Sequence, residues 1–367
     1  MYLLLSSALG GIGSVLLAVL ILLAMITVHE FGHYLSGRAL GFAVEEFSVG
    51  FGPALFKRKS RRTGELFSIR AVPLGGYCAF AGEEGEGGFN AKPPWKRIIV
   101  LVSGALANYL LAVALIMVAF AAFGQTALRI DGVTYPEGYD SSDSFVAGDV
   151  LLRAEGRGIY LTTDIMDALA GKSAGERVDF TVSRGGKETD IGVELRADCN
   201  FSGSADTSLM WEALGVDSAV GEDGVEYLML SSVNVRFPFF ESVGRSFAYS
   251  VKIGGTIFRV LGELITGNLS LNAVGGPVTT IKLTSQLAAQ GVQSMLEIAA
   301  YIGVNLAVFN LLPIPALDGS KVVFCLIEQV RGRPVSRKVE SAIHFVGFIF
   351  ILGFALLADL LQFVRCG

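Results

Sequence analysis

The sequence predicts a polytopic α-helical membrane protein with four transmembrane helices and an inserted α+β domain outside the cytoplasm. Three observations lead to this fold class. Hydrophobic residues make up 52% of the 367 positions and charged residues only 17%, against about 25% in soluble domains. Four apolar stretches are long enough to cross a bilayer. An acidic segment separates the second stretch from the third.

Each of the four apolar stretches has the roughly 20 residues that a helix needs to span the hydrocarbon core. Residues 1–28 carry no charge and lack the positive start of a secretory signal peptide, so we expect the first stretch to stay in the membrane. Residues 237–265 carry charges every few positions and predict an amphipathic helix at the membrane surface. The predicted spans cover approximately residues 7–37, 98–123, 295–327 and 345–364.

The distribution of charge predicts the orientation. Residues 38–97 hold ten Lys or Arg residues, and the loop before the last span holds four more. Positive loops stay in the cytoplasm. Residues 125–235 hold twenty Asp or Glu residues against eight Lys or Arg, so we expect this segment and both termini on the outer side.

The chain therefore divides into an N-terminal membrane part (1–124), an extracytoplasmic domain (125–235) and a C-terminal membrane part (236–367). Inside the domain, FVAGDVLLRAEG predicts a turn and a strand, and DIMDALAG has helical spacing. RVDFTVSRGGKETDIGVEL predicts two strands joined at Gly185-Gly186. This order resembles a PDZ domain, and the alternative is another small β-rich domain.

Several other features have ordinary explanations. No basic stripe with interleaved aromatic residues is present, so we expect no nucleic-acid partner. The run Lys57–Arg62 suits an orientation signal that contacts lipid headgroups. His344, at the start of the last span, suits an interfacial residue rather than a metal ligand. Four cysteines without CxxC spacing predict isolated thiols: Cys78, Cys199, Cys325 and Cys366.

The segment His29-Glu30-Phe31-Gly32-His33 carries the strongest chemical signal. Histidines four apart project from one face of a helix and can bind one metal ion, and the glutamate between them can act as general base. The chain has three histidines, and two are here, within an apolar span where such residues are rare and usually functional. The alternative is a pair of polar residues at a helix end that reach toward the interface.

Catalytic zinc takes three protein ligands, so a third is required. Asp318 follows Pro313 and Pro315 inside the third apolar stretch, where a carboxylate is energetically costly and usually has a function. At about 1.5 Å per residue, His29 and Asp318 each fall roughly 30 Å from the outer face, so they can meet near the cytoplasmic side. The alternative for Asp318 is a cap at a helix restart.

HEFGH in the first span, NLLPIPALDG in the third and a PDZ-like insert resemble the site-2 protease family of intramembrane metalloproteases. The similarity is greatest to the bacterial branch that cleaves anti-sigma factors and signal-peptide remnants. FSVGFGPALF (47–56), PLGGYCAFAGE (73–83) and GGPV (275–278) also fit that branch. Where the family often has GPxxN, this chain has SGALAN, so Asn108 is kept but the proline that would kink the helix is not.

The resemblance implies a role for each matching residue. His29, His33 and Asp318 would bind one Zn²⁺ per chain, and Glu30 would activate water. A β-hairpin dipping into the membrane would offer a strand edge to an unwound substrate. The implied substrate-binding residues are Asn310, Pro313 and Pro315 on the unwound stretch and Gly50, Phe51 and Gly52 in the hairpin.

The expected function is intramembrane zinc metalloendopeptidase activity on single-span membrane proteins, in regulated intramembrane proteolysis. The resemblance implies a multi-pass protein of the bacterial inner membrane whose PDZ-like domain filters substrates by size. Two alternatives come from other classes. A membrane-bound PDZ adaptor with a vestigial metal site would not need Glu30, and a zinc transporter would need a second metal cluster that the sequence lacks.

Overall fold

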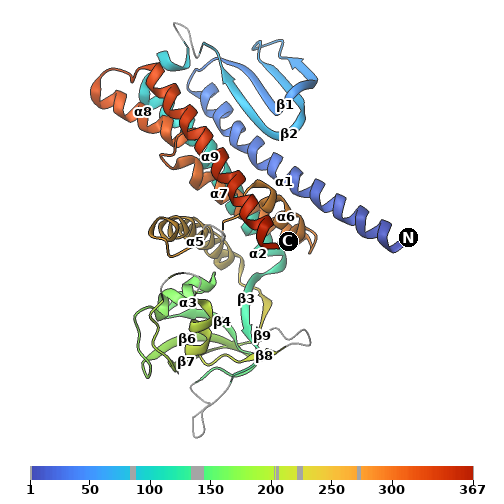
Figure 1. Ribbon diagram of the computed structural model, residues 1–367, viewed down its shortest axis with the longest axis vertical. Coiled ribbons are helices and arrows are strands. Elements are labelled where there is room, and N and C mark those ends of the chain that lie inside the picture. Colours follow the sequence, from blue (N-terminus) through green and yellow to red (C-terminus); the bar gives the residue numbers. More distant parts are fainter. Residues whose placement is uncertain are drawn as a thin grey trace. The chain divides into compact units, whose positions relative to one another are not determined.

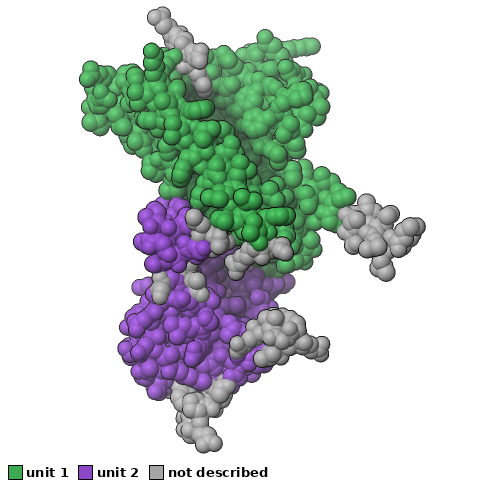
Figure 2. Space-filling view, in the orientation of Figure 1, with its two compact units in different colours: residues 1–118, 271–367 green, residues 119–270 purple. Residues whose placement is uncertain are grey.

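The computed structural model describes residues 2–82, 88–133, 144–201, 203, 206–220, 226–270 and 274–366. The chain divides into two compact units, coloured separately in Figure 2. Unit 1 comprises residues 1–118 and 271–367 and contains long helices and a β-hairpin (Figure 1). Unit 2 comprises residues 119–270 and contains the larger sheet.

Four helices in the described part of the chain are long and apolar enough to cross a membrane: α1 (Tyr2–Ala39), α2 (Pro94–Phe123), α7 (Val292–Leu311) and α9 (Arg337–Cys366). The prediction of four apolar helices is confirmed. The third differs at its end, because α7 stops at Leu311 and the chain restarts as α8 (Asp318–Arg331). Pro313 explains the stop, since proline has no N–H and disfavours a helical residue before it.

Strands β1 (Val44–Lys59) and β2 (Leu66–Phe80) form an antiparallel sheet in which both strands bend and pair twice. Residues 44–49 pair with 76–80 on one side and with 66–69 on the other, so residues 76–80 form one edge of the sheet. Gly50, in the bend, has φ of +88°, and a Cβ there would lie 2.9 Å from two carbonyl oxygens of β2. Only glycine fits this position.

The side chain of Arg70 stabilises the bend. Its Nη1 donates to the carbonyl oxygen of Gly52 at 2.8 Å, and its Nη2 donates to Glu46 Oε1 at 2.7 Å. Ser68 also donates to Glu46 Oε1, at 2.6 Å. Aromatic residues from α1, the hairpin and the connection between them belong to one hydrophobic cluster: Tyr34, Phe42, Phe47 and Phe80.

Unit 1 also contains a helix that the sequence patterns did not reveal, α6 (Pro277–Ala288), which packs against α1, α7 and α9. Asp359 of α9 caps its start by accepting from the backbone N–H groups of Val278 and Thr279 at 2.9 and 3.0 Å. Gly276 leaves the space for this cap, because a Cβ there would lie 2.5 Å from the Asp359 carboxyl carbon. A short 3₁₀ helix, η1 (Phe89–Ala91), precedes α2.

Unit 2 is built on an antiparallel sheet whose longest run has the strand order β10-β3-β4-β6-β7. The predicted hairpin at Gly185-Gly186 is present, since Arg184 pairs with Lys187 across it. Helices α3 (Thr162–Leu169) and α4 (Thr207–Ala213) contribute to the same core. The strands are β3 (Gln125–Ile130), β4 (Val150–Ala154), β5 (Arg157–Gly158), β6 (Arg177–Arg184), β7 (Lys187–Glu194), β8 (Ser218–Val220), β9 (Glu226–Leu228) and β10 (Leu230–Val235).

Helix α5 (Phe239–Thr266) belongs to unit 2 and has two unlike faces. One face is tied to α3 by two ion pairs, Lys252 to Asp164 at 2.5 Å and Arg259 to Asp167 at 2.6 Å. The other exposes large apolar side chains, including Phe240, which is 87% exposed. An amphipathic helix is therefore present where the sequence predicted one.

Cys78, Cys199 and Cys325 form no disulfide in the described part of the chain. The side chain of Cys366, the fourth predicted thiol, lies outside the described residues.

Candidate metal centre

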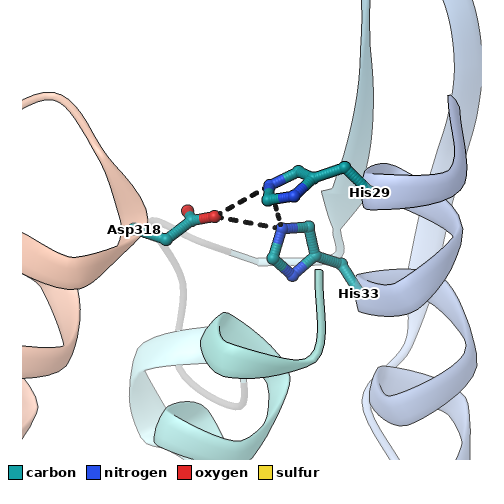
Figure 3. A group of neighbouring side chains, drawn as sticks. All are labelled: His29, His33 and Asp318. Atoms are coloured by element: carbon teal, nitrogen blue, oxygen red, sulfur yellow. Dashed lines mark hydrogen bonds and ion pairs between the residues drawn. The ribbon is translucent and has the colours of Figure 1, made fainter. Parts of the chain in front are cut away.

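Helix α1 carries His29 and His33 four positions apart, so both side chains project from one face (Figure 3). They are 8% and 7% exposed. Asp318, the first residue of α8, brings its carboxylate to the same point. Its Oδ2 lies 3.0 Å from His29 Nε2 and 3.2 Å from His33 Nε2, and the two Nε2 atoms are 3.1 Å apart.

The three atoms fit a zinc ion. Tetrahedral ligands at about 2.0–2.1 Å from zinc lie about 3.3 Å from one another, close to the separations found here. The carbonyl oxygen of Val100 can only accept, so His33 Nδ1 donates to it at 2.8 Å and His33 Nε2 keeps the lone pair that a metal needs. Two imidazoles and a carboxylate leave a fourth position open, as catalytic zinc requires. No second cluster of this kind occurs among the described residues.

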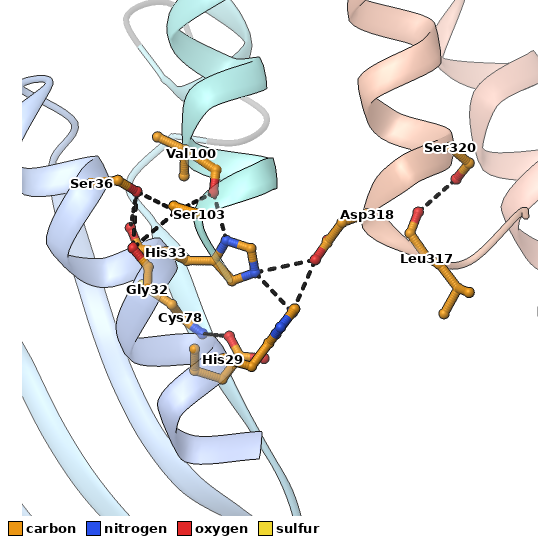
Figure 4. Close-up of polar contacts among 11 residues, drawn as sticks. His29, Gly32, His33, Ser36, Cys78, Val100, Ser103, Leu317, Asp318 and Ser320 are labelled. Atoms are coloured by element: carbon orange, nitrogen blue, oxygen red, sulfur yellow. Dashed lines mark hydrogen bonds and ion pairs between the residues drawn. The ribbon is translucent and has the colours of Figure 1, made fainter. Parts of the chain in front are cut away.

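Two glycines let α2 come close to the histidines. A Cβ on Gly104 would lie 2.5 Å from His33 Nε2, and one on Gly32 would lie 2.4 Å from the carbonyl oxygen of Ser103. The hydroxyl groups of Ser36 and Ser103 share a hydrogen bond of 2.6 Å across the same contact (Figure 4). Small residues of this kind let membrane helices pack tightly.

Glu30, between the two histidines in sequence, is oriented by β2. The backbone N–H of Cys78 donates to Glu30 Oε2 at 3.0 Å. Cys78 belongs to the sheet edge formed by residues 76–80, and both residues line the same cavity as the three candidate ligands. Sequence reasoning missed this contact, since 48 positions separate the two residues and the donor is a backbone group.

The cavity has a volume of about 1010 Å³ and is lined entirely by residues of unit 1. Asn310, one of the predicted substrate-binding residues, is on its wall with the candidate ligands. Phe51 stacks on Tyr77, with ring centroids 6.4 Å apart, and Tyr77 in turn lines the cavity. Five predicted substrate-binding residues are not part of the wall: Gly50, Phe51, Gly52, Pro313 and Pro315.

Part of the cavity wall is charged. Arg97, only 6% exposed, forms an ion pair of 2.5 Å with Glu328, which joins the start of α2 to α8. Lys321 and Arg337 also line the cavity. The sequence assigned Arg97 only to a positively charged loop, because nothing in its neighbourhood indicates a partner on α8.

Apart from the ion-paired Arg97, three side chains near these helices have buried polar atoms without a hydrogen-bond partner among the described residues. Asn108 is 0% exposed, and neither polar atom of its side chain has a partner. Nδ1 of His29 and Nε2 of His344 are the other such atoms. The sequence singled out Asn108 as the residue kept from the GPxxN pattern, and its burial on α2 is consistent with an internal role.

Two histidines of an HExxH motif, a third candidate ligand from a distant helix and a helix of transmembrane length together are typical of a membrane metallopeptidase. Residues 17–354 match the description Peptidase family M50. The chain therefore belongs to this family, the site-2 protease family, as the sequence resemblance indicated.

Named relatives agree with the family. A protein of Clostridium perfringens named "Putative zinc metalloprotease" is 30% identical over 352 residues, covering 94% of this chain and 97% of the relative. Proteins with the same description in Fusobacterium nucleatum and Brucella suis are 31% identical over 350 residues and 29% identical over 364 residues. The alignments cover 93% and 94% of this chain and 96% and 93% of those relatives.

Proposed function

We propose that this protein is an intramembrane zinc metalloendopeptidase that hydrolyses peptide bonds within or near the transmembrane segments of single-span membrane proteins. The observation that carries the proposal is the convergence of His29, His33 and Asp318, whose ligand atoms all lie within 4.8 Å of one another, in a cavity that Glu30 also lines. Three donors around one point support one Zn²⁺ per chain. Family membership and the names of the relatives support zinc metalloprotease chemistry.

The residues divide the chemical work. Zinc, when bound, supplies a Lewis acid that lowers the pKa of a water molecule to about 7 and polarises the scissile carbonyl. Glu30 accepts the proton of the attacking water and passes it to the leaving nitrogen. The hydrogen bond from Cys78 N–H holds Oε2 of Glu30, which leaves Oε1 to receive that proton. The Asn310 amide, on the cavity wall, would hold the substrate backbone.

The β1–β2 sheet supports binding of an extended substrate. A helical substrate hides its peptide groups in internal hydrogen bonds, so it must unwind before cleavage, and strand addition replaces the lost bonds. The edge formed by residues 76–80 reaches Glu30 through Cys78. Gly50, Phe51 and Gly52 would act through the bend that shapes this sheet, and Pro313 and Pro315 through the break that separates α7 from α8.

The family context extends the proposal to the substrate and the setting. We place the protein in a bacterial inner membrane, with both termini and the PDZ-like domain outside the cytoplasm and the active site near the cytoplasmic side. The substrates would be anti-sigma factors or signal-peptide remnants already shortened on the outer side, in regulated intramembrane proteolysis. The PDZ-like domain would act as a size filter. Equal cleavage of full-length and shortened forms of one substrate would contradict that filter.

The test compares the wild type with Glu30→Gln in membranes that contain a tagged single-span substrate, and measures bound zinc in the same preparations. Glu45→Gln is the matched control, because Glu45 is exposed and outside the cavity. We expect Glu30→Gln to hold zinc but lose cleavage, and the control to match the wild type. Unchanged cleavage by Glu30→Gln would refute the proposed base. Zinc binding without cleavage by any form, across several substrates, would favour a catalytically vestigial PDZ adaptor.

A further inference from the structure

His344, on α9, contacts the segment that leads into Asp318. Its Nδ1 accepts a hydrogen bond from the backbone N–H of Ala316 at 3.0 Å. The imidazole packs edge-on against Phe324 of α8, with ring centroids 5.7 Å apart, and lines the cavity that contains the candidate ligands. The sequence suggested an interfacial residue rather than a metal ligand, and the structure adds a defined hydrogen-bond partner two positions before Asp318.

The bonded residue lies in a strained turn. Leu317 N–H donates to the carbonyl oxygen of Ile314 at 3.2 Å, which closes a β-turn with Pro315 second and Ala316 third. Ala316 has φ of +75°. A proline in the second place followed by a positive φ identifies a type II turn, whose third place normally takes glycine or asparagine. At a positive φ the Cβ of alanine lies too close to the backbone carbonyl oxygen, so the turn is strained and a contact from another segment stabilises it.

His344 supplies that support in a specific way. Types I and II differ by a rotation of about 150° in the peptide group between the second and third residues, which points the N–H of the third residue in nearly opposite directions. An acceptor fixed beside Ala316 therefore stabilises the type II form. Gly347, one turn further along α9, allows the close approach, since a Cβ there would lie 2.2 Å from Cβ of Pro315.

We propose that His344 is a positioning residue for the metal centre, which holds the turn before Asp318 in the form that places the carboxylate beside the two histidines. Loss of the acceptor lets the turn relax, and the direction in which α8 begins changes with it. Ligand distances in metal sites hold to about 0.2 Å, so a small shift of Asp318 weakens zinc binding. Since Nδ1 accepts, the ring proton is on Nε2, 4.0 Å from a carboxylate oxygen of Glu340.

The experiment measures zinc affinity of the purified full-length protein in detergent by competition with a chromogenic chelator, and cleavage of a model substrate in parallel. His344→Leu removes the acceptor. His344→Asn keeps one, because Asn Oδ1 takes the place of Nδ1. Phe345→Leu is the matched control, since Phe345 is the exposed neighbour on α9. A double variant, His344→Leu with Ala316→Gly, removes the acceptor and also the strain that it offsets.

We expect His344→Leu to bind zinc about ten-fold more weakly, as for other residues that orient metal ligands, and to lose cleavage in proportion. His344→Asn and the double variant should recover zinc affinity to within about three-fold of the wild type and of Phe345→Leu. Wild-type affinity in His344→Leu, or failure of both restoring variants, would overturn the inference. The inference about His344 rests on the proposed zinc site, but zinc affinity is measured independently of cleavage. A protein that binds zinc and cleaves no substrate would therefore contradict the proposed function and leave the inference about His344 standing.

Discussion

One methyl group at Gly104 tests whether α2 sets the geometry of the metal centre. In Gly104→Ala, the new Cβ would start 2.5 Å from His33 Nε2, whereas ordinary van der Waals contact begins at 3.4 Å. The imidazole or the helix must therefore move by about 0.9 Å, several times the roughly 0.2 Å within which ligand distances hold in metal sites. We expect zinc affinity to fall at least ten-fold, or about 1.4 kcal/mol, and cleavage to fall with it.

The assay uses the full-length variant in detergent, with zinc content measured by mass spectrometry and zinc affinity by chelator competition. Circular dichroism checks that the helices are retained. Gly353→Ala is the matched control, because Gly353 is also in a membrane helix and a Cβ there would meet no atom within 4 Å. Wild-type zinc affinity in a well-folded Gly104→Ala protein would show that the contact between α2 and His33 does not set the site.

Two further predictions concern the surrounding structure. Asp164 accepts hydrogen bonds from the N–H groups of Tyr160 and Leu161 and from Lys252, so Asp164→Ala should lower the free energy of unfolding by about 2 kcal/mol and reduce hydrogen-exchange protection of α3 and α5 about thirty-fold. Asp167→Ala is the control, because it removes an exposed ion pair and should change the protection little. Equal effects of the two variants would contradict the role given to Asp164. Partial burial raises the pKa of Glu46, but hydrogen bonds from Ser68 and Arg70 outweigh it and hold that pKa below its ordinary value of 4.5. Because the pKa of Glu46 is lower in the folded protein than in the unfolded chain, ionised Glu46 stabilises the hairpin at pH values above 4.5, and amide protection of β1 and β2 should fall as the pH drops below 4.5. Glu46→Gln should remove this pH dependence. Amide protection in the wild type that does not change with pH would refute the prediction.

Local patterns were sufficient to predict the parts of the site that follow from spacing. His29 and His33 share a face because helical geometry places positions four apart together, and the structure shows both pointing at one carboxylate. Asp318 could be singled out because a carboxylate in an apolar stretch is costly without a partner. The four apolar helices could be predicted because each contains about 20 consecutive apolar residues, the length needed to span a bilayer.

The contacts that shape the site could not be predicted in this way. Gly104 matters only because α2 lies against His33, and Cys78 only because a bent strand brings its N–H to Glu30. Both are contacts between segments far apart in sequence, and the presence of a glycine or a cysteine does not by itself indicate such a contact. Helix α6 was missed because it is short and only moderately apolar. The charges of α5 predicted an amphipathic helix at the membrane surface, but their spacing could not show that two of them form ion pairs with α3.

The close packing of α1 against α2 limits the directions from which another polypeptide can reach the site. Helices that must admit another chain between them need roughly 8–10 Å of axis separation on each side of the newcomer. A methyl group on Gly32 of α1 would lie within 3 Å of backbone atoms of Ser103 and Gly104 of α2. The contact between α1 and α2 is therefore too close to admit a polypeptide at the level of the candidate metal centre. A protein chain that reaches Glu30 must enter by another side, and variants that separate α1 from α2 would weaken the site without creating an entry path.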